Sequence, residues 1–224
     1  GDFNGDGWAD IFYAPWPGKE GYWYENPARK DAAWNQHLAF GCVDNESPMW
    51  GDVNLDGRPD LVFNTDGRLG YATYDPAKPN EVWQFHAITP KGSYHKYTHG
   101  IGFGDINGDG RVDILEGNGW WEQPANAAPS QTWTLHPFKF ADAAAQMFAY
   151  DVDGDGLKDV ITAWHCHLYG LVWYQQSKSP SGEITWQQHV ILPAKPDMDS
   201  GDLRISQLHA FDLVDMNGDG LLDI

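Results

Sequence analysis

The sequence predicts an all-β protein made of repeated units, and three observations support this. An acidic nine-residue motif, D-x-[DN]-x-D-G-x-x-D, occurs five times in 224 residues, with spacings of 50, 53, 46 and 64 between successive first aspartates. Short apolar runs flank these motifs, and no segment has the longer period of an amphipathic helix. Aromatic residues make up 14% of the chain, which also contains 25 glycines and 14 prolines. That composition is typical of short strands joined by tight turns.

Calcium binding explains the residue types in the acidic motif. Calcium takes six to eight oxygen ligands, and a tight loop turns the side chains at positions one, three and five toward one point. Glycine at position six permits the sharp turn, position seven offers a backbone carbonyl, and aspartate at position nine completes the set. The sequence therefore predicts up to five Ca²⁺ sites. Their expected side-chain ligands are Asp2, Asn4, Asp6, Asp10, Asp52, Asn54, Asp56, Asp60, Asp105, Asn107, Asp109, Asp113, Asp151, Asp153, Asp155, Asp159, Asp215, Asn217, Asp219 and Asp223.

Each acidic loop is expected to join two strands. A short apolar run such as Ile11–Tyr13 follows the loop, and runs such as Gly100–Phe103 and His209–Val214 precede it. An EF-hand would instead place helices on both sides of its calcium loop. The β-like runs therefore exclude that fold.

Each unit continues with an aromatic strand, such as Tyr22–Pro27, and then a segment containing W-x-x-H. The Trp/His pairs are Trp34/His37, Trp83/His86, Trp133/His136 and Trp186/His189. A histidine that recurs in register in every unit indicates packing or a structural hydrogen bond. Four strands in about every 50 residues are typical of the antiparallel blades of a β-propeller.

We expect one β-propeller domain over residues 1–224, incomplete at both ends. Its repeat units run approximately over 1–45, 46–98, 99–144, 145–208 and 209–224, which gives four blades and a partial fifth. Closed propellers have four to eight blades, and the fifth loop cannot also complete the first blade. We therefore expect a fragment of a larger, seven-bladed ring, whose signal sequence is not in this fragment.

The composition excludes several partners. A formal net charge of −18 disfavours nucleic acid, because binding phosphates needs a basic surface. No apolar run is long enough to insert into a membrane. The two cysteines, Cys42 and Cys166, are more consistent with buried free thiols than with a disulfide framework, although one bridge remains an alternative.

The acidic loop between two strands resembles the FG-GAP/VCBS repeat found in propellers such as those of integrin alpha chains. The resemblance covers all five repeats and implies a propeller fold with calcium loops. It does not imply one activity, because adhesins, lectins and polysaccharide lyases share such repeats.

Four segments are similar to the propeller of aldos-2-ulose dehydratase/isomerase-type proteins and their bacterial relatives: Tyr97–Gly110, Gly119–Pro124, Ala145–Phe148 and Ser206–Asp215. This resemblance implies removal of water from a keto-sugar, which is a carbon–oxygen lyase reaction. The cupin domains of that family are absent from this sequence.

Histidines outside the W-x-x-H register are candidates for this chemistry. His99 and His209 each stand six residues before an acidic loop, so an extended strand carries them to the end of the blade opposite calcium. Water elimination needs a base, an electrophile and an acid. The expected catalytic residues are His99, His209, His165, His167, Arg204 and Tyr97, with His99 or His209 as base and Arg204 or Tyr97 as electrophile. His165 and His167, expected on one strand face, are also candidate ligands of a transition metal.

Two hypotheses follow for the function. The first is a lyase or dehydratase acting on a keto-sugar or a uronide. The second is a non-catalytic adhesion propeller that binds glycans or a protein partner. Loops of this kind are expected to bind calcium weakly, as extracellular modules do, which favours the periplasm, cell surface or medium.

Overall fold

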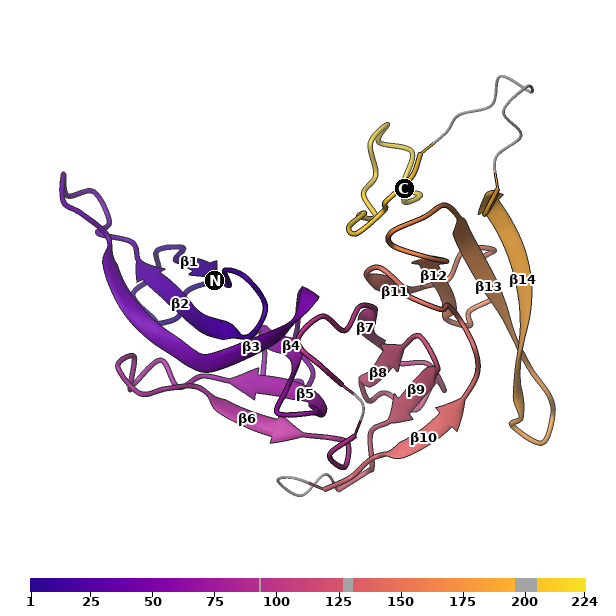
Figure 1. Ribbon diagram of the computed structural model, residues 1–224, viewed down its shortest axis with the longest axis horizontal. Helices are drawn as coiled ribbons and strands as arrows, with labels where there is room; N and C mark the ends of the chain where they lie inside the picture. The colour runs from indigo at the N-terminus through magenta and orange to yellow at the C-terminus, as the bar shows by residue number, and fades with distance from the viewer. Residues whose placement is uncertain (93, 127–130, 196–204) are drawn as a thin grey trace. The chain divides into compact units, whose positions relative to one another are not determined.

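The computed structural model describes residues 1–92, 94–126, 131–195 and 205–224, and its regular elements there are all β-strands (Figure 1). The strands are β1 (Ile11–Tyr13), β2 (Lys19–Glu25), β3 (Asn35–Gly51), β4 (Asp60–Thr65), β5 (Arg68–Thr73), β6 (Gln84–Ala87), β7 (Ile101–Gly104), β8 (Asp113–Glu116), β9 (Gly119–Glu122), β10 (Thr134–Pro137), β11 (Met147–Tyr150), β12 (Asp159–Ala163), β13 (Leu171–Lys178) and β14 (Ile184–Leu192). The all-β prediction is confirmed. Within these described ranges, no helix has the length and apolarity needed to cross a membrane.

The chain forms two compact units. The first contains Gly1–Thr98 and Asn126–Trp133, and the second contains His99–Ala125 and Thr134–Ile224. The main boundary, between residues 98 and 99, coincides with the predicted boundary between the second and third repeats.

The first unit contains a six-stranded sheet in the order β1-β2-β3-β4-β5-β6. Strand β3 belongs to two repeats. Its beginning pairs with β2 of the first repeat (Leu38 opposite Tyr22), and its end pairs with β4 of the second (Trp50 opposite Leu61). The register shifts between Asp44 and Met49, where β3 passes from one repeat to the next. Two predicted strands are therefore continuous.

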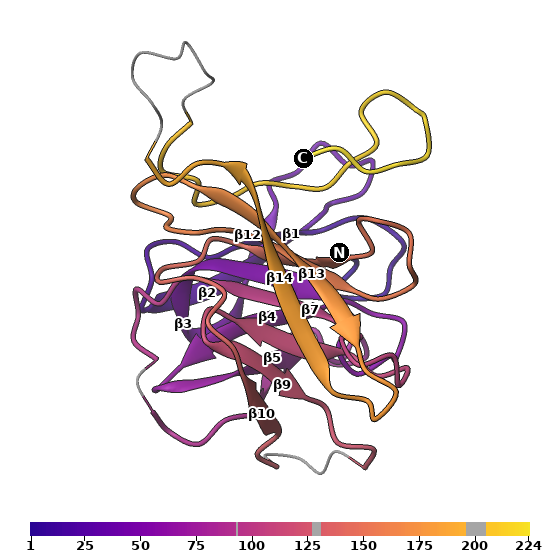
Figure 2. The ribbon, with the colours of Figure 1, turned by 90° about the vertical axis from the view of Figure 1, so that its right-hand side faces the viewer.

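The second unit contains an eight-stranded sheet in the order β10-β9-β8-β7-β11-β12-β13-β14. Strands β7–β10 are the antiparallel strands of the third repeat, and β11–β14 are those of the fourth, of which β13 and β14 face the viewer in Figure 2. The two sets meet where β7 and β11 pair in parallel, with Gly102 opposite Met147. A Cβ atom at Gly102 would lie 2.2 Å from the Met147 carbonyl oxygen, so this close approach requires glycine.

Stacked aromatic–histidine pairs recur in all four repeats. The His of each W-x-x-H segment stacks on an aromatic ring of the preceding strand, as Trp120 and His136 do with ring centroids 4.1 Å apart and an 8° interplanar angle. The other pairs are Trp23/His37, Tyr71/His86 and Trp173/His189. Each pair occupies directly opposed positions in the ladder. The predicted packing role of these histidines is confirmed.

The second residue of an acidic loop fills the core in three repeats. Phe3, Val53 and Ile106 are buried, and Phe3 contacts the rings of Trp23, Trp50, Tyr74 and Trp83. The equivalent Val152 is 38% exposed and Met216 is 77% exposed. The first three loops are therefore anchored to the core by an apolar side chain, and the last two are anchored less.

The fifth repeat is less regular than predicted. His209–Val214 does not form a strand, and Val214 makes only an isolated bridge with Asp223. A second bridge, between Ser206 and Tyr169, joins this segment to the fourth repeat. The predicted strand before the fifth loop is wrong because its residues have only these isolated pairings, and no continuous ladder, among the described residues.

Candidate functional site

The five acidic loops share one hydrogen-bond pattern. In the first loop, Asp2 accepts hydrogen bonds from the backbone N–H groups of Asp6 at 3.1 Å and Gly7 at 2.9 Å. Asn4 also accepts from the Asp6 N–H, at 3.1 Å. The first aspartate accepts from the position-six N–H in every loop. Backbone donors therefore orient the oxygens at positions one and three.

The aspartate at position nine joins the first, third and fourth loops to their repeats, because it accepts a backbone hydrogen bond from beyond the loop, whereas Asp60 of the second loop accepts from Val53 and Asn54 within its own loop. Asp113 is buried and accepts from the backbone N–H groups of Ile106 and Gln123, both at 2.9 Å. Burial raises the pKa of Asp113 to about 7 and that of Asp60 to about 6. The Asp113 carboxylate therefore links the buried Ile106 of the loop to Gln123, which directly follows the aromatic strand β9. A carboxylate has about four lone-pair sites, so two hydrogen bonds leave capacity for a cation, and the ligand role of position nine stays a prediction.

The fourth loop brings together three carboxylates of the kind that calcium prefers. Carboxylate oxygens of Asp151, Asp153 and Asp155 lie within 4.8 Å of one another. Two oxygens bound to one Ca²⁺ at about 2.3–2.6 Å are separated by no more than about 5 Å, so these three fit a single ion. All three are hard oxygen donors, as this cation prefers.

The second and third loops differ, because an arginine at position seven turns back onto the loop. Arg58 Nη2 lies 2.7 Å from Asp56 Oδ2, and Arg111 makes the equivalent ion pair with Asp109. A cation bound at these loops would share its carboxylate with the guanidinium. In the fourth loop, position seven is Leu157.

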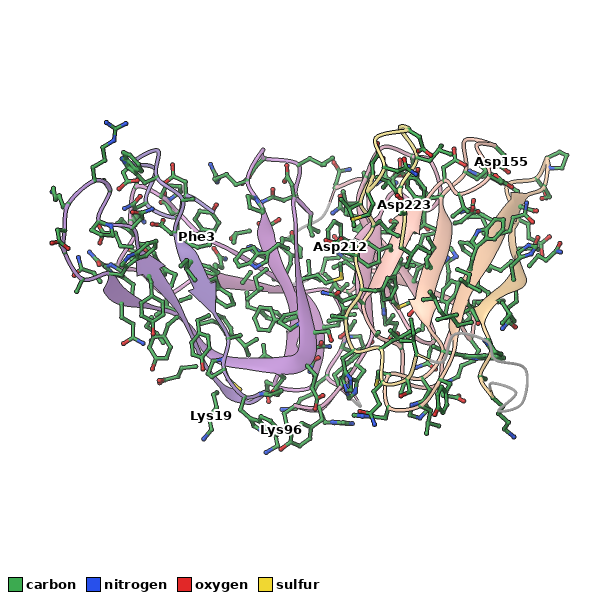
Figure 3. The ribbon with its side chains drawn as sticks, turned by 90° about the horizontal axis from the view of Figure 1, so that it is seen from above. Phe3, Lys19, Lys96, Asp155, Asp212 and Asp223 are labelled. Carbon is green, nitrogen blue, oxygen red and sulfur yellow. The ribbon has the colours of Figure 1, made fainter. Side chains whose placement is uncertain are left out.

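The predicted catalytic residues divide between the two units. Tyr97 belongs to the first unit, where its hydroxyl accepts from Trp16 Nε1 at 3.3 Å. That hydrogen bond and the nearby Lys96 ammonium lower the pKa of Tyr97. In Figure 3, Lys96 and Lys19 lie at the opposite end of the first unit from Phe3 in the acidic loop. Arg204 lies outside the described residues.

Three of the predicted histidines converge in the second unit. The ring centroids of His99, His167 and His209 are separated by 4.6 Å (167–209), 4.9 Å (99–167) and 5.6 Å (99–209). Side-chain ligand atoms of these histidines and of Cys166 all lie within 4.8 Å of one another. We call these four residues the His₃Cys cluster.

Strand register explains this convergence. His99 lies two residues before the start of β7, and β7 runs parallel to β11, so both strands start at the same edge of the sheet. Strand β12 is antiparallel to β11, so the residues after β12, including Cys166 and His167, reach that edge too. The Tyr169–Ser206 bridge then brings the segment that contains His209 alongside.

His165 lies beside the cluster without joining its set of close ligand atoms. Its ring centroid is 6.2 Å from that of His167, and its Nδ1 accepts the His167 backbone N–H at 3.2 Å. The expectation that the two histidines share a strand face is wrong, because β12 ends at Ala163 and residues 165–167 form a turn.

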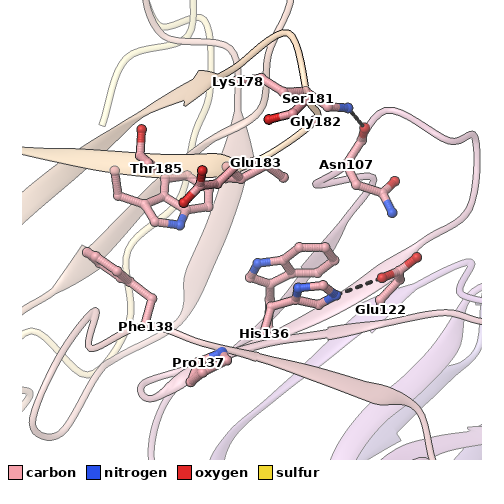
Figure 4. Close-up of a pocket in the computed structure, with 13 residues that line it drawn as sticks. Asn107, Glu122, His136, Pro137, Phe138, Lys178, Ser181, Gly182, Glu183 and Thr185 are labelled. Atoms are coloured by element: carbon pink, nitrogen blue, oxygen red, sulfur yellow. Dashed lines mark hydrogen bonds and ion pairs between the residues drawn. The ribbon is translucent and has the colours of Figure 1, made fainter.

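A groove between the third and fourth repeats was not predicted from the sequence. It has a volume of about 780 Å³. Its walls are formed by the β7–β8 loop, by β9 and β10, and by the β13–β14 hairpin (Figure 4). Its lining includes Trp120, Glu122, His136, Phe138, Glu183 and Trp186. No sequence signal marks it, because it forms where two neighbouring repeats are apposed.

Hydrogen bonds position the polar groups of this groove. His136 Nε2 lies 2.7 Å from Glu122 Oε2, while its ring covers Trp120. Lys178 donates to the backbone carbonyl of Asn107, which connects the hairpin to the third acidic loop. Glu183 is exposed at the opposite wall.

Comparison with known proteins gives a family. The FG-GAP-like repeat family matches residues 2–63 and 52–116, which together span just over half of the chain. No curated protein matches the sequence. A solved structure, that of the V. cholerae biofilm matrix protein Bap1, is similar with a TM-score of 0.37 and 15% identity; the match covers 85% of this chain and 36% of that one.

The repeated acidic loops, the four-stranded antiparallel repeats and the family match agree with one another. The resemblance to aldos-2-ulose dehydratase stays a prediction. Neither cysteine forms a disulfide, as expected, but only Cys166 is buried, whereas Cys42 is half-buried. The chain belongs to the FG-GAP-like repeat family.

Proposed function

We propose that this chain is a calcium-stabilised propeller domain that binds carbohydrate, without catalysis, in the groove between its third and fourth repeats. The observation that carries the proposal is the groove's lining, which combines the aromatic side chains of Phe138 and Trp186 with the carboxylates of Glu122 and Glu183.

This lining suits a sugar chain. Aromatic rings pack against the apolar C–H face of a pyranose, and carboxylates accept hydrogen bonds from its hydroxyl groups. Trp186 and Phe138 are half-buried and lie 6.1 Å apart by ring centroid, so part of each ring is available to a ligand. The Glu122–His136 pair offers a fixed acceptor beside them.

Calcium has a supporting role in this proposal. Asp105, Asn107 and Asp109 belong to the loop next to the groove, and Lys178 holds that loop to the β13–β14 hairpin. Occupation of the loop would stiffen one wall of the groove. Because such loops fit the weak-affinity class that operates outside cells, we place the domain at the cell surface, in the periplasm or in the medium.

The test is binding of a glycan array by the full chain in calcium, compared with a Glu183→Ala variant. A hydrogen bond to a charged group contributes about 1.5–3 kcal/mol, so we expect the best ligand to lose about tenfold to a hundredfold in affinity. Gln188→Ala, on β14 outside the groove, is the matched control and should bind normally. Equal affinity for all three proteins, or no glycan bound by any, would contradict the proposal.

A second candidate is the keto-sugar lyase, and the convergence of His99, His167 and His209 favours it, since acid–base catalysis needs clustered imidazoles. Its test is turnover of 1,5-anhydrofructose, followed by enone absorbance. Activity that disappears in His99→Ala would support the lyase, whereas an inactive protein that binds glycans would support the binding domain alone.

A further inference from the structure

The His₃Cys cluster has the donor set of a transition-metal site. Three imidazoles and one thiol are borderline to soft ligands, which suit Zn²⁺ and do not suit calcium. Their ligand atoms lie within 4.8 Å of one another. The set differs from the acidic loops in chemistry and in position, and the groove does not include any of its residues.

The separations are close to those of a tetrahedral zinc site. With Zn–N at about 2.0–2.1 Å and Zn–S at about 2.3 Å, ligand atoms lie about 3.3–3.6 Å apart. The cluster needs to contract by about 1.5 Å at most, which rotation of half-buried or exposed imidazoles provides. His99 and His209 are half-buried and His167 is exposed, so the core does not enclose any of these three rings.

The thiol is fixed where a metal ligand would be needed. Cys166 is 0% exposed and packs with Ala145 and Ala163. Its backbone N–H donates to the Ala143 carbonyl at 2.8 Å, which fixes the turn that carries both Cys166 and His167. Leu208 packs against the same apolar cluster, and this contact brings its neighbour His209 over the thiol.

We propose that His99, Cys166, His167 and His209 bind one Zn²⁺ in a closed, four-coordinate site. Four protein ligands leave no open position for a substrate, so the metal is structural, and imidazoles that hold it cannot also be the acid and base of the lyase considered as the second candidate above. On binding, the Cys166 thiol loses its proton to solvent, and the thiolate with three neutral imidazoles leaves a net charge of +1 at the site.

The site would connect three repeats. His99 precedes β7 of the third repeat, Cys166 and His167 follow β12 of the fourth, and His209 lies in the fifth. The fifth repeat has only isolated bridges among the described residues, so few backbone hydrogen bonds attach it to the fourth repeat. A metal cross-link through His209 would attach it more firmly. Because zinc binds the folded chain, it stabilises that state.

The experiment uses the full chain, stripped of metal and kept reduced, with excess Ca²⁺ present to occupy the acidic loops. Co²⁺ replaces Zn²⁺ as a spectroscopic probe, because a tetrahedral cobalt–thiolate site has visible d–d bands and a near-ultraviolet charge-transfer band. Variants Cys166→Ser and His209→Ala remove proposed ligands. The controls are Cys42→Ser, which alters the other thiol, and His165→Ala, which alters the neighbouring histidine.

We expect one equivalent of Co²⁺ to give both bands, Zn²⁺ to displace it, and zinc to raise the melting temperature of the wild type and both controls. Cys166→Ser should lose the charge-transfer band, and His209→Ala should bind at least about tenfold more weakly. If Cys166→Ser does not fold, His209→Ala still decides, because that side chain is outside the core. The absence of a thiolate band in the wild type, or equal zinc affinity in His209→Ala and His165→Ala, would overturn the proposal.

Discussion

At the residue scale, Leu55 is the exception among the acidic loops. The residue at position four has a positive φ in all five loops and is glycine in four of them, but Leu55 adopts φ 58° with a side chain. That region costs a non-glycine residue about 1–2 kcal/mol. Leu55 is 56% exposed, so little packing compensates for the cost.

Leu55→Gly should therefore raise the free energy of unfolding by about 0.5–1 kcal/mol, after the greater freedom of glycine in the unfolded chain is subtracted. The reverse change, Gly154→Leu, should lower it by a similar amount, because a Cβ atom there meets nothing within 4 Å and only the backbone conformation is strained. Urea unfolding measures both. Destabilisation by Leu55→Gly would show that its side chain makes a contact that outweighs the strain.

His86 should make the stability of the first unit depend on pH. Burial lowers the pKa of His86 below its ordinary value, while Thr73 Oγ1 lies 3.0 Å from its Nε2 and Tyr71 stacks on its ring. The folded state therefore binds fewer protons here than the unfolded state. Stability present at neutral pH is lost as the pH falls below about 6.5 toward the lower pKa of the folded state.

His86→Gln removes this titration and keeps a hydrogen-bonding group for Thr73. We expect the variant to lose less stability than the wild type between pH 7.5 and 5.5, as followed by urea unfolding at each pH. An identical pH profile for the two proteins would show that His86 has the same pKa folded and unfolded.

At the element scale, the loops should differ in calcium affinity. The fourth loop has three aspartates at positions one, three and five, whereas the second has Asn54 at position three and an Arg58–Asp56 ion pair. Affinity rises with ligand charge, and a competing guanidinium lowers it. We expect the fourth loop to fill first.

Two substitutions test this order. Asp153→Asn gives the fourth loop the amide of the other loops and should weaken its calcium binding by about tenfold. Arg58→Leu gives the second loop the position-seven residue of the fourth and should strengthen binding by about twofold to fivefold. Native mass spectrometry across a Ca²⁺ titration counts the bound ions; unchanged titrations for both variants would refute the order.

Periodic sequence features predicted elements well, and aperiodic ones did not. The acidic loops, the strands around the first four of them and the Trp120–His136 type of stack could be predicted because each repeats in register. The His₃Cys cluster was predicted in part, since counting residues along strands placed His99 and His209 at one end. That Cys166 would join them depends on a turn after β12, which no pattern signals.

The continuity of β3 and the groove were missed for a related reason. Both arise where one repeat meets the next, and a repeat pattern describes what each unit contains and not how neighbours pair. The parallel pairing of β7 with β11 is such a junction. Tertiary pairing, and not local propensity, decides these features.

At the scale of the whole molecule, the negative charge of the acidic loops is expected to lower the stability of the folded state unless cations neutralise it. The chain has a formal net charge of −18, and five Ca²⁺ would reduce it to −8. Without cations, clustered carboxylates such as Asp151, Asp153 and Asp155 repel one another. Calcium bound only to the folded chain would remove that repulsion and stabilise each repeat.

The most direct measurement of this central claim is a thermal melt of the full chain, with millimolar Ca²⁺ in one sample and a chelator in the other, alongside calorimetric titration of the stripped protein. We predict a clearly higher melting temperature in calcium and binding of several ions, up to five, with Mg²⁺ unable to replace them. An unchanged melting temperature together with no measurable heat of Ca²⁺ binding would contradict the account.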